Sequence, residues 1–155
     1  MSLPSPSDKP RVTAQIAGRP LQPLLLPFVV GYFASALVCD LIYFQSSAAA
    51  RFMAPEFGSI TVWLLGFGLI TAVLCGMAAL ADLMGERRFR ALPDLGLYLG
   101  GNVLLVVVQA HNLALRLAHG SDAIVPMGLI LSLLAVAVLV ATPSQNWARL
   151  YRQAR

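Results

Sequence analysis

The chain has 155 residues, of which 58% are hydrophobic and only 12% are charged, and its formal net charge is +4. So little charge cannot cover the surface of a soluble domain of this size, so the composition excludes an ordinary soluble protein and indicates a single-domain integral membrane protein. The basic residues lie in the expected tails and loops, where membrane topology accounts for them. We therefore expect a lipid bilayer as partner and no nucleic acid.

The N-terminal part is expected to contain a tail, one membrane span and a loop. Residues 1–20 are rich in Pro and Ser and predict an extended cytoplasmic tail. The apolar run over residues 24–44 is long enough to cross a bilayer, and it carries Asp40 near one end. Residues 45–59 contain Pro and Gly and predict a loop.

The rest of the chain predicts three more membrane helices, at residues 60–81, 95–115 and 124–141. The four spans together make a membrane domain over residues 21–143. The fourth span is almost featureless, with Ser132 its only polar side chain. Residues 144–155 carry aromatic and basic side chains and predict a short helix lying on the inner leaflet.

The distribution of Lys and Arg predicts the topology. Nine of the 11 lie in the N-terminal tail, the loop over residues 83–94 and the C-terminal tail, whereas the other two are Arg51 and Arg116. Because Lys and Arg accumulate on the cytoplasmic side, both termini are expected inside, which requires an even number of spans. The sequence therefore predicts an all-α, integral membrane four-helix bundle with both termini in the cytoplasm.

The third span combines an apolar background with a polar stripe. On a helix with about 100° per residue, its polar side chains fall within roughly 80° on one side of Asn102. They are Asp94, Tyr98, Gln109, Asn112 and Arg116. Polar side chains at membrane depth are costly and usually face the interior of a bundle, so this stripe is the first candidate for a functional site.

The opposite side of the third span is a candidate packing face. Gly96 and Gly100 lie there, at the four-residue spacing that lets two membrane helices approach closely, and His111 falls on the same side. Ala72 and Gly76 form a similar pair in the second span. These four small residues are predicted to mediate helix packing.

Depth in the membrane predicts a polar cluster near the outer face. Asp40 and His111 each lie about sixteen residues, or roughly 24 Å of helix, from the cytoplasmic end of their span, and Gln109, Asn112 and Arg116 lie at a similar level. Arg116 is the obvious counter-charge for Asp40. Two interpretations stay open: a proton, quinone or ligand pocket, or an ion pair with hydrogen bonds that fixes the packing of the first and third spans.

No cofactor is assigned, although haem b and quinone are alternatives. His111 is the only histidine in a span and a candidate haem ligand, but a second axial ligand would have to be Met77 or Met127. Tyr98 and Asn102 form an inner-half polar pair that could line a quinone pocket or bond a neighbouring helix. The sequence contains no catalytic triad, phosphate loop or Cys/His metal spacing, so we expect neither an enzyme nor a metal site.

A series of short motifs, in their order and spacing, carries a family resemblance. They are Arg19-Pro-Leu-Gln-Pro, Cys39-Asp40-Leu, Trp63-Leu-Leu, Ala81-Asp82-Leu, Arg87-Arg88-Phe-Arg-Ala-Leu-Pro-Asp94 and Gly101-Asn102-Val103, with Asn112 and Arg116 closing the third span. Over nearly the whole chain this pattern resembles the bacterial four-helix membrane family known as domain of unknown function 2231. The resemblance implies a bundle in a bacterial inner membrane.

The chain also departs from that family pattern. Members tend to carry histidines near the first span and at the start of the third, and here those places are held by Arg19, Gln22, Pro27 and Tyr98. Members tend to end the fourth span with a Gly-rich, Trp-containing turn, whereas this chain has Thr142-Pro-Ser-Gln. Some are joined to cytochrome c-like or other redox domains, which implies a setting in electron transport. If the family's histidines bind haem, this chain lacks those ligands.

The residues and the resemblance together predict a non-catalytic accessory subunit that packs against a larger redox complex, respiratory or photosynthetic, in a bacterial inner membrane. Two alternatives stay open. One is a b-type haem- or quinone-binding electron-transfer protein. The other is a small proton-coupled carrier, which is less favoured because no span is broken at its midpoint by Gly and Pro.

Overall fold

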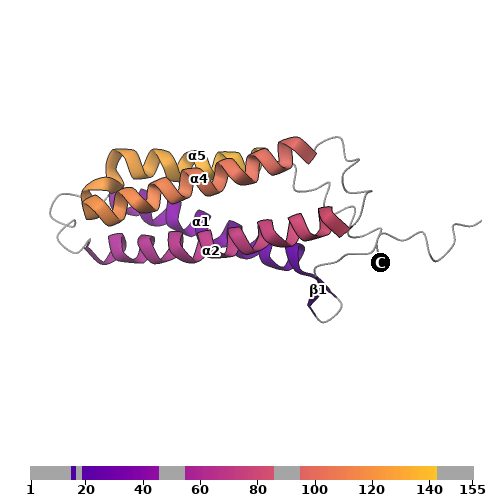
Figure 1. Ribbon diagram of the computed structural model, residues 1–155. Coiled ribbons are helices and arrows are strands. Elements are labelled where there is room, and N and C mark those ends of the chain that lie inside the picture. The colour runs from indigo at the N-terminus through magenta and orange to yellow at the C-terminus, as the bar shows by residue number, and fades with distance from the viewer. Residues whose placement is uncertain (1–14, 17–18, 46–54, 86–94, 143–155) are drawn as a thin grey trace, which may run out of the picture.

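The structure, a computed structural model, describes residues 15–16, 19–45, 55–85 and 95–142. Its four long helices are α1 (Leu21–Gln45), α2 (Pro55–Gly85), α4 (Leu95–His119) and α5 (Leu129–Ala141). They run side by side along one axis, with α1 and α2 in one layer and α4 and α5 in the other (Figure 1). Consecutive helices pack against each other and α5 packs against α1, which closes the bundle.

All four helical segments are long and apolar enough to cross a membrane, when α5 is counted from Ile124. The 25 residues of α4, for example, extend over roughly 37 Å, against about 30 Å for a hydrocarbon core. Large apolar side chains point outward all round the bundle, among them Phe28, Ile70 and Val140. The predicted all-α four-helix membrane bundle is therefore confirmed. The short strands β1 (Gln15–Ile16) and β2 (Arg19–Pro20) form one antiparallel pair before α1.

The core of the bundle consists of small and branched apolar side chains from all four helices. Its buried members are Val29, Phe33, Ala36, Leu65, Ala72, Cys75, Leu105, Val108 and Ala135. α1 and α2 pack closely at Gly68, where a Cβ atom would lie 2.5 Å from the Phe33 ring. A residue larger than glycine at this position would force the two helices apart.

The second and third helices are longer than predicted. α2 begins at Pro55 rather than near residue 60, because proline suits the first helical position, where its missing N–H leaves no bond unmade. α4 continues to His119, and the chain then turns at Gly120, whose φ of 61° favours glycine. The helix therefore extends four residues beyond the predicted span, which ended at residue 115.

The fourth span has its predicted bounds, Ile124–Ala141, but its start is not regular α-helix. A 3-10 turn, η3 (Gly120–Ala123), leads into an irregular segment, η4 (Ile124–Gly128), in which Val125 is extended with φ −121° and ψ 125°. The cause is Pro126, because proline lacks an N–H and disfavours helical backbone in the residue before it. Regular α-helix begins only at Leu129.

Several sequence predictions fall outside the described residues. These are the surface helix over 144–155, most of the tail over 1–20, the loop over 86–94 with Asp94, and residues 46–54.

Candidate functional site

The polar stripe predicted for the third span is the buried face of α4. Tyr98, Gln109, Asn112 and Arg116 are each at most 3% exposed, and Asn102 is partly buried. Their spacing of mostly three, four or seven residues places them on one side of the helix. This face therefore meets the other three helices.

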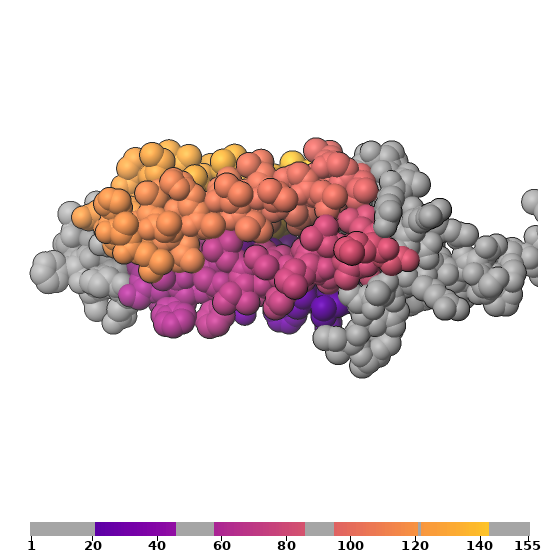
Figure 2. All heavy atoms as spheres, viewed as in Figure 1, coloured from indigo at the N-terminus to yellow at the C-terminus, as the bar shows by residue number. Residues whose placement is uncertain are grey.

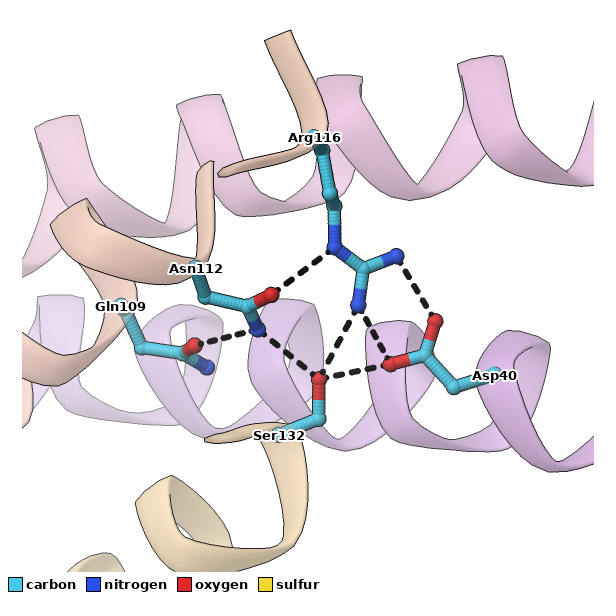
Figure 3. Close-up of polar contacts among 5 residues, drawn as sticks. All are labelled: Asp40, Gln109, Asn112, Arg116 and Ser132. Atoms are coloured by element: carbon cyan, nitrogen blue, oxygen red, sulfur yellow. Dashed lines mark hydrogen bonds and ion pairs between the residues drawn. The ribbon is translucent and has the colours of Figure 1, made fainter. Parts of the chain in front are cut away.

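Arg116 of α4 and Asp40 of α1 form an ion pair inside the bundle. Nη1 donates to Oδ1 at 2.8 Å and Nη2 donates to Oδ2 at 2.7 Å (Figure 3). The two side chains are 1% and 0% exposed. Two parallel bonds match the fork of a guanidinium to a carboxylate. Since the surroundings solvate neither charge, each group depends on the other.

Ser132 brings α5 into the same arrangement. Its hydroxyl donates to Oδ2 of Asp40 at 2.6 Å and accepts from Nδ2 of Asn112 at 3.0 Å and from Nη2 of Arg116 at 3.4 Å. Nε of Arg116 donates to Oδ1 of Asn112 at 2.9 Å. Together with Gln109, these residues form what we call the ion-pair network, which links three helices by side chains alone (Figure 3).

The ion-pair network has a direction, because a guanidinium can only donate hydrogen bonds and an ionised carboxylate can only accept them. Arg116 therefore fixes Oδ1 of Asn112 as an acceptor, and Nδ2 of Asn112 donates to Oε1 of Gln109 at 3.1 Å. Nε2 of Gln109 is left as the terminal donor, buried and without a partner among the described residues. The network thus begins at a carboxylate and ends in a donor.

Gly128 provides the space for the guanidinium. A Cβ at this position would lie 2.7 Å from the carbonyl oxygen of Ala123 and 2.9 Å from Nη2 of Arg116. Cβ atoms do not approach other atoms this closely, so glycine is required where η4 passes over the ion pair. The irregular start of the fourth span and the buried charge therefore belong to one packing arrangement.

His111 does not join the ion-pair network, and the prediction that it does is wrong. It is exposed, whereas Gln109 and Asn112 on either side of it are buried. His111 lies about 200° around the helix from Gln109, so a similar depth does not bring the two to the same face. The structure thus brings together four of the five residues predicted to cluster: Asp40, Gln109, Asn112 and Arg116.

Tyr98 and Asn102 lie around a small cavity in the other half of the bundle. Nε2 of Gln22 donates to the Tyr98 hydroxyl, which joins the start of α1 to α4, and Nδ2 of Asn102 donates to the Tyr98 carbonyl at 2.8 Å. Cys75 and Thr142 line the same cavity, whose volume is about 40 Å³. That volume is enough for one or two water molecules but far below the roughly 150 Å³ that accommodates benzene.

The small residues predicted for helix packing divide into two groups. Ala72 is buried in the core on α2, whereas Gly76 is partly buried there and a Cβ atom on it would meet no other heavy atom within 4 Å. Gly96 and Gly100 are exposed on α4, and a Cβ atom on either one would meet no other heavy atom within 4 Å. They therefore pack against nothing within the described part of the chain.

Two site residues were missed by sequence reasoning. Ser132 completes the ion-pair network, and its signal was its position as the lone polar side chain in an apolar span. Gln22 is 2% exposed and bonds Tyr98. The residue pattern alone carries no comparable signal for Gln22, but the family resemblance names it, with Tyr98, among the places where members tend to carry histidines.

The contacts of these residues are better suited to holding the helices together than to catalysing a reaction. The Asp40 carboxylate is already bound by a guanidinium and a hydroxyl, so it is held in place rather than poised to abstract a proton. Within the described ranges, no group of three or more His, Cys, Asp or Glu side chains could hold a metal ion. The ion-pair network is therefore suited to fixing the relative positions of three helices.

Comparison with known proteins gives one finding. Neither the curated proteins nor the solved structures give a match. A family model described as "Predicted membrane protein (DUF2231)" matches residues 18–145, a range that includes all four helices, the ion-pair network and the Tyr98 cavity. It is the same family that the sequence motifs resemble. The chain therefore belongs to the DUF2231 family of predicted membrane proteins.

Proposed function

We propose that this protein is a non-catalytic structural subunit of a larger membrane complex, and that it docks through the exposed side of α4. The observation that carries the proposal is an exposed transmembrane face that combines small residues with a histidine. The partner is a transmembrane helix of another membrane protein. The site of action is the bacterial inner membrane, with both termini in the cytoplasm, as the distribution of Lys and Arg favours.

Small residues lie on the exposed side of α4 towards both of its ends, with the exposed Val103, Leu104 and Val107 between them. They form two series in which each residue lies four positions after the one before it. Gly96 and Gly100 make up the first series, and Ala110, Ala114 and Ala118 make up the second. All five are exposed. In membranes, such spacing lets a second helix approach until the backbones touch, and helix association there relies on this packing because lipid is as apolar as the side chains. We call these residues and His111 the exposed α4 face.

His111 adds a polar group that lipid cannot satisfy. It lies eight residues, or roughly 12 Å, before the end of α4, and α4 is only about 7 Å longer than a hydrocarbon core. The imidazole therefore lies within the hydrocarbon region. A polar group exposed to lipid at this depth costs several kcal/mol unless it finds a partner. A helix with a hydrogen-bonding side chain, packed against the exposed α4 face, would satisfy it.

The ion-pair network supports a structural role. It contains the charges that a carrier or an electron-transfer site would use, but they are bound to one another between α1, α4 and α5. The bundle can therefore act as a rigid scaffold that presents one face. The redox character of the complex is proposed from the family resemblance, since relatives joined to cytochrome c-like domains suggest electron transport.

The test is co-purification from native membranes. The tagged full-length chain is extracted in digitonin, and the associated proteins are measured by native gel and quantitative mass spectrometry. Gly100→Leu places a large side chain on the exposed α4 face, and we expect it to reduce the associated protein roughly tenfold, equivalent to about 1.4 kcal/mol. Gly31→Leu is the matched control, since Gly31 is exposed on α1 and its Cβ would also meet nothing within 4 Å.

Two results would contradict the proposal. If Gly96→Leu and Gly100→Leu both stay fully associated, the exposed α4 face is not the docking surface. If only a second copy of this chain is recovered, the role as a subunit of a larger complex is wrong. Stoichiometric partners without redox cofactors would contradict the electron-transport setting and leave the docking surface intact.

A further inference from the structure

Two hollows of different character meet at the same pair of side chains. One is the Tyr98 cavity inside the bundle. The other is a groove of about 290 Å³ between α2 and α4, on the face of the molecule that these two helices form in Figure 2. Ala72 and Asn102 line both hollows. The interior cavity and the exterior groove are therefore adjacent, with Asn102 at the boundary.

The groove is built for hydrocarbon. Apart from Asn102, all residues that line the groove are apolar. On α4 they include Val103 and Val107, whose side chains are 64% and 58% exposed. Its lining on α4 runs from Leu99 to Val107, a length of roughly 12 Å. The groove lies in the membrane-spanning part of both helices, where the surrounding medium is hydrocarbon and not water.

The depth of the groove comes from Gly76 on α2. A Cβ atom at this position would meet no other heavy atom within 4 Å, so the missing side chain leaves open space. Met77 beside it is 61% exposed and forms part of the wall. An extended chain can therefore sink between the helices at this point.

The cavity next to the groove offers hydrogen bonds. The Asn102 amide has two N–H groups and a carbonyl oxygen, and its bond to the Tyr98 carbonyl uses one N–H. Tyr98 and Thr142 line the same space. With a volume of about 40 Å³, the cavity takes a hydroxyl or carboxyl group, whereas an aromatic or quinone ring needs several times more.

We propose that the groove and the cavity together form a binding site for a single-chain lipid with a small oxygen-bearing end, a fatty acid or a fatty alcohol. The chain lies in the groove between α2 and α4. The polar end passes Ala72 and is held by Asn102 inside the bundle. This site is complete within the isolated chain and is tested there without a docked partner. Its α4 wall, Val103 and Val107, lies on the same side of α4 as Gly96 and Gly100, so a helix docked at the exposed α4 face would cover the groove.

The test uses the full chain reconstituted in phosphatidylcholine nanodiscs. The probes are palmitic acid and hexadecanol, each carrying a diazirine in mid-chain, and the labelled residues are mapped by mass spectrometry after irradiation. We expect labelling to concentrate on the groove residues of α2 and α4 and to be competed by unlabelled oleic acid or oleyl alcohol. The two probes distinguish a carboxyl from a hydroxyl end by which one binds more tightly.

Two kinds of variant test separately where the hydrocarbon chain of the lipid and its polar end bind. Gly76→Leu fills the groove and is expected to reduce labelling roughly tenfold, whereas Gly31→Leu adds the same side chain to another exposed helix position and leaves labelling unchanged. Val103→Trp fills the groove from α4 and replaces Gly76→Leu if that variant does not fold. Asn102→Leu is expected to weaken competition by oleic acid or oleyl alcohol but not by hexadecane.

The proposal is overturned if labelling spreads over all four helices in proportion to their exposure and is unchanged in both groove-filling variants. That pattern describes ordinary lipid around the bundle. Decylubiquinone is expected not to compete. Competition equal to that of oleic acid would show that the cavity admits a ring, and the assignment of a small polar end would then be wrong.

Discussion

The two sides of α4 use polar residues in opposite ways. On the buried side, Gln109, Asn112 and Arg116 form hydrogen bonds with each other and with α1 and α5. On the exposed side, His111 is exposed together with small residues, and a Cβ atom on Gly96 or Gly100 would meet no other heavy atom of the described residues within 4 Å. Since the same helix carries both, the difference lies in the neighbours that each side meets.

This comparison separates two kinds of requirement. The buried side is satisfied within one chain, so its residues should determine the stability of the isolated bundle. The exposed side is not satisfied within one chain, so changes to its residues should affect assembly without destabilising the isolated bundle. Three sets of variants test the comparison in the purified chain, through its stability in detergent.

The largest effect is expected from Arg116→Leu. It leaves Asp40 charged and buried without its counter-charge, which typically costs about 3–5 kcal/mol of unfolding free energy. The loss is measured by unfolding in SDS followed by circular dichroism. The double variant Asp40→Leu with Arg116→Leu should recover much of it, because no charge then remains. Leu117→Ala, at an exposed neighbouring position, is the control. A cost below about 1 kcal/mol would show that the ion pair does not hold the helices together.

A smaller effect is expected from adding one methyl group on each side of α4. Gly128→Ala pushes a Cβ into the Arg116 guanidinium and the Ala123 carbonyl, which we expect to cost about 1–3 kcal/mol. Gly100→Ala meets nothing and should stabilise the isolated helix by roughly 0.5–1 kcal/mol, because alanine favours helix over glycine. Thermal unfolding of the two variants side by side gives the comparison, and equal shifts of the same sign would contradict it.

The smallest effect is expected at the end of the ion-pair network. Gln109→Leu removes one accepted hydrogen bond but also removes the buried Nε2 donor that has no partner in the described part of the chain, so the change should stay within about 1 kcal/mol. Asn112→Leu removes the acceptor of Arg116 Nε and the donor to Ser132, and we expect it to cost more, about 1–3 kcal/mol. The same cost for both variants in the SDS assay would mean that Nε2 has an acceptor after all.

Much of this arrangement follows from the sequence because helical periodicity and membrane depth are properties of the chain itself. The four helices are visible as apolar runs, and the buried side of α4 is visible as a stripe of polar residues at helical spacing. Arg116 and Asp40 can be paired because each is too costly alone in a membrane.

The rest of the site depends on contacts between helices, which cannot be predicted from the sequence of one helix. His111 has the right depth for the ion-pair network, but its direction around the helix excludes it. Ser132 becomes important only because α5 packs beside Asp40. Pro126 lies within an apolar run, so hydrophobicity alone does not reveal its effect. Proline changes the backbone of the residue before it, and in this irregular segment Gly128 lies over the guanidinium. The groove between α2 and α4 depends on how far apart these two helices lie, and the residue pattern of a single helix does not determine that distance.

The central claim, that the exposed α4 face is a docking surface, is tested most directly by crosslinking in native membranes. A photoreactive phenylalanine analogue replaces Leu104, which lies about one helical turn after Gly100 and beside the exposed α4 face. In the control it replaces Leu133 on α5; the two leucines are 48% and 59% exposed. The account predicts one discrete protein adduct from position 104, lost when Gly100→Leu is added, and none from position 133. Equal crosslinking from both positions, an adduct only to a second copy of this chain, or no protein adduct from position 104 would contradict it.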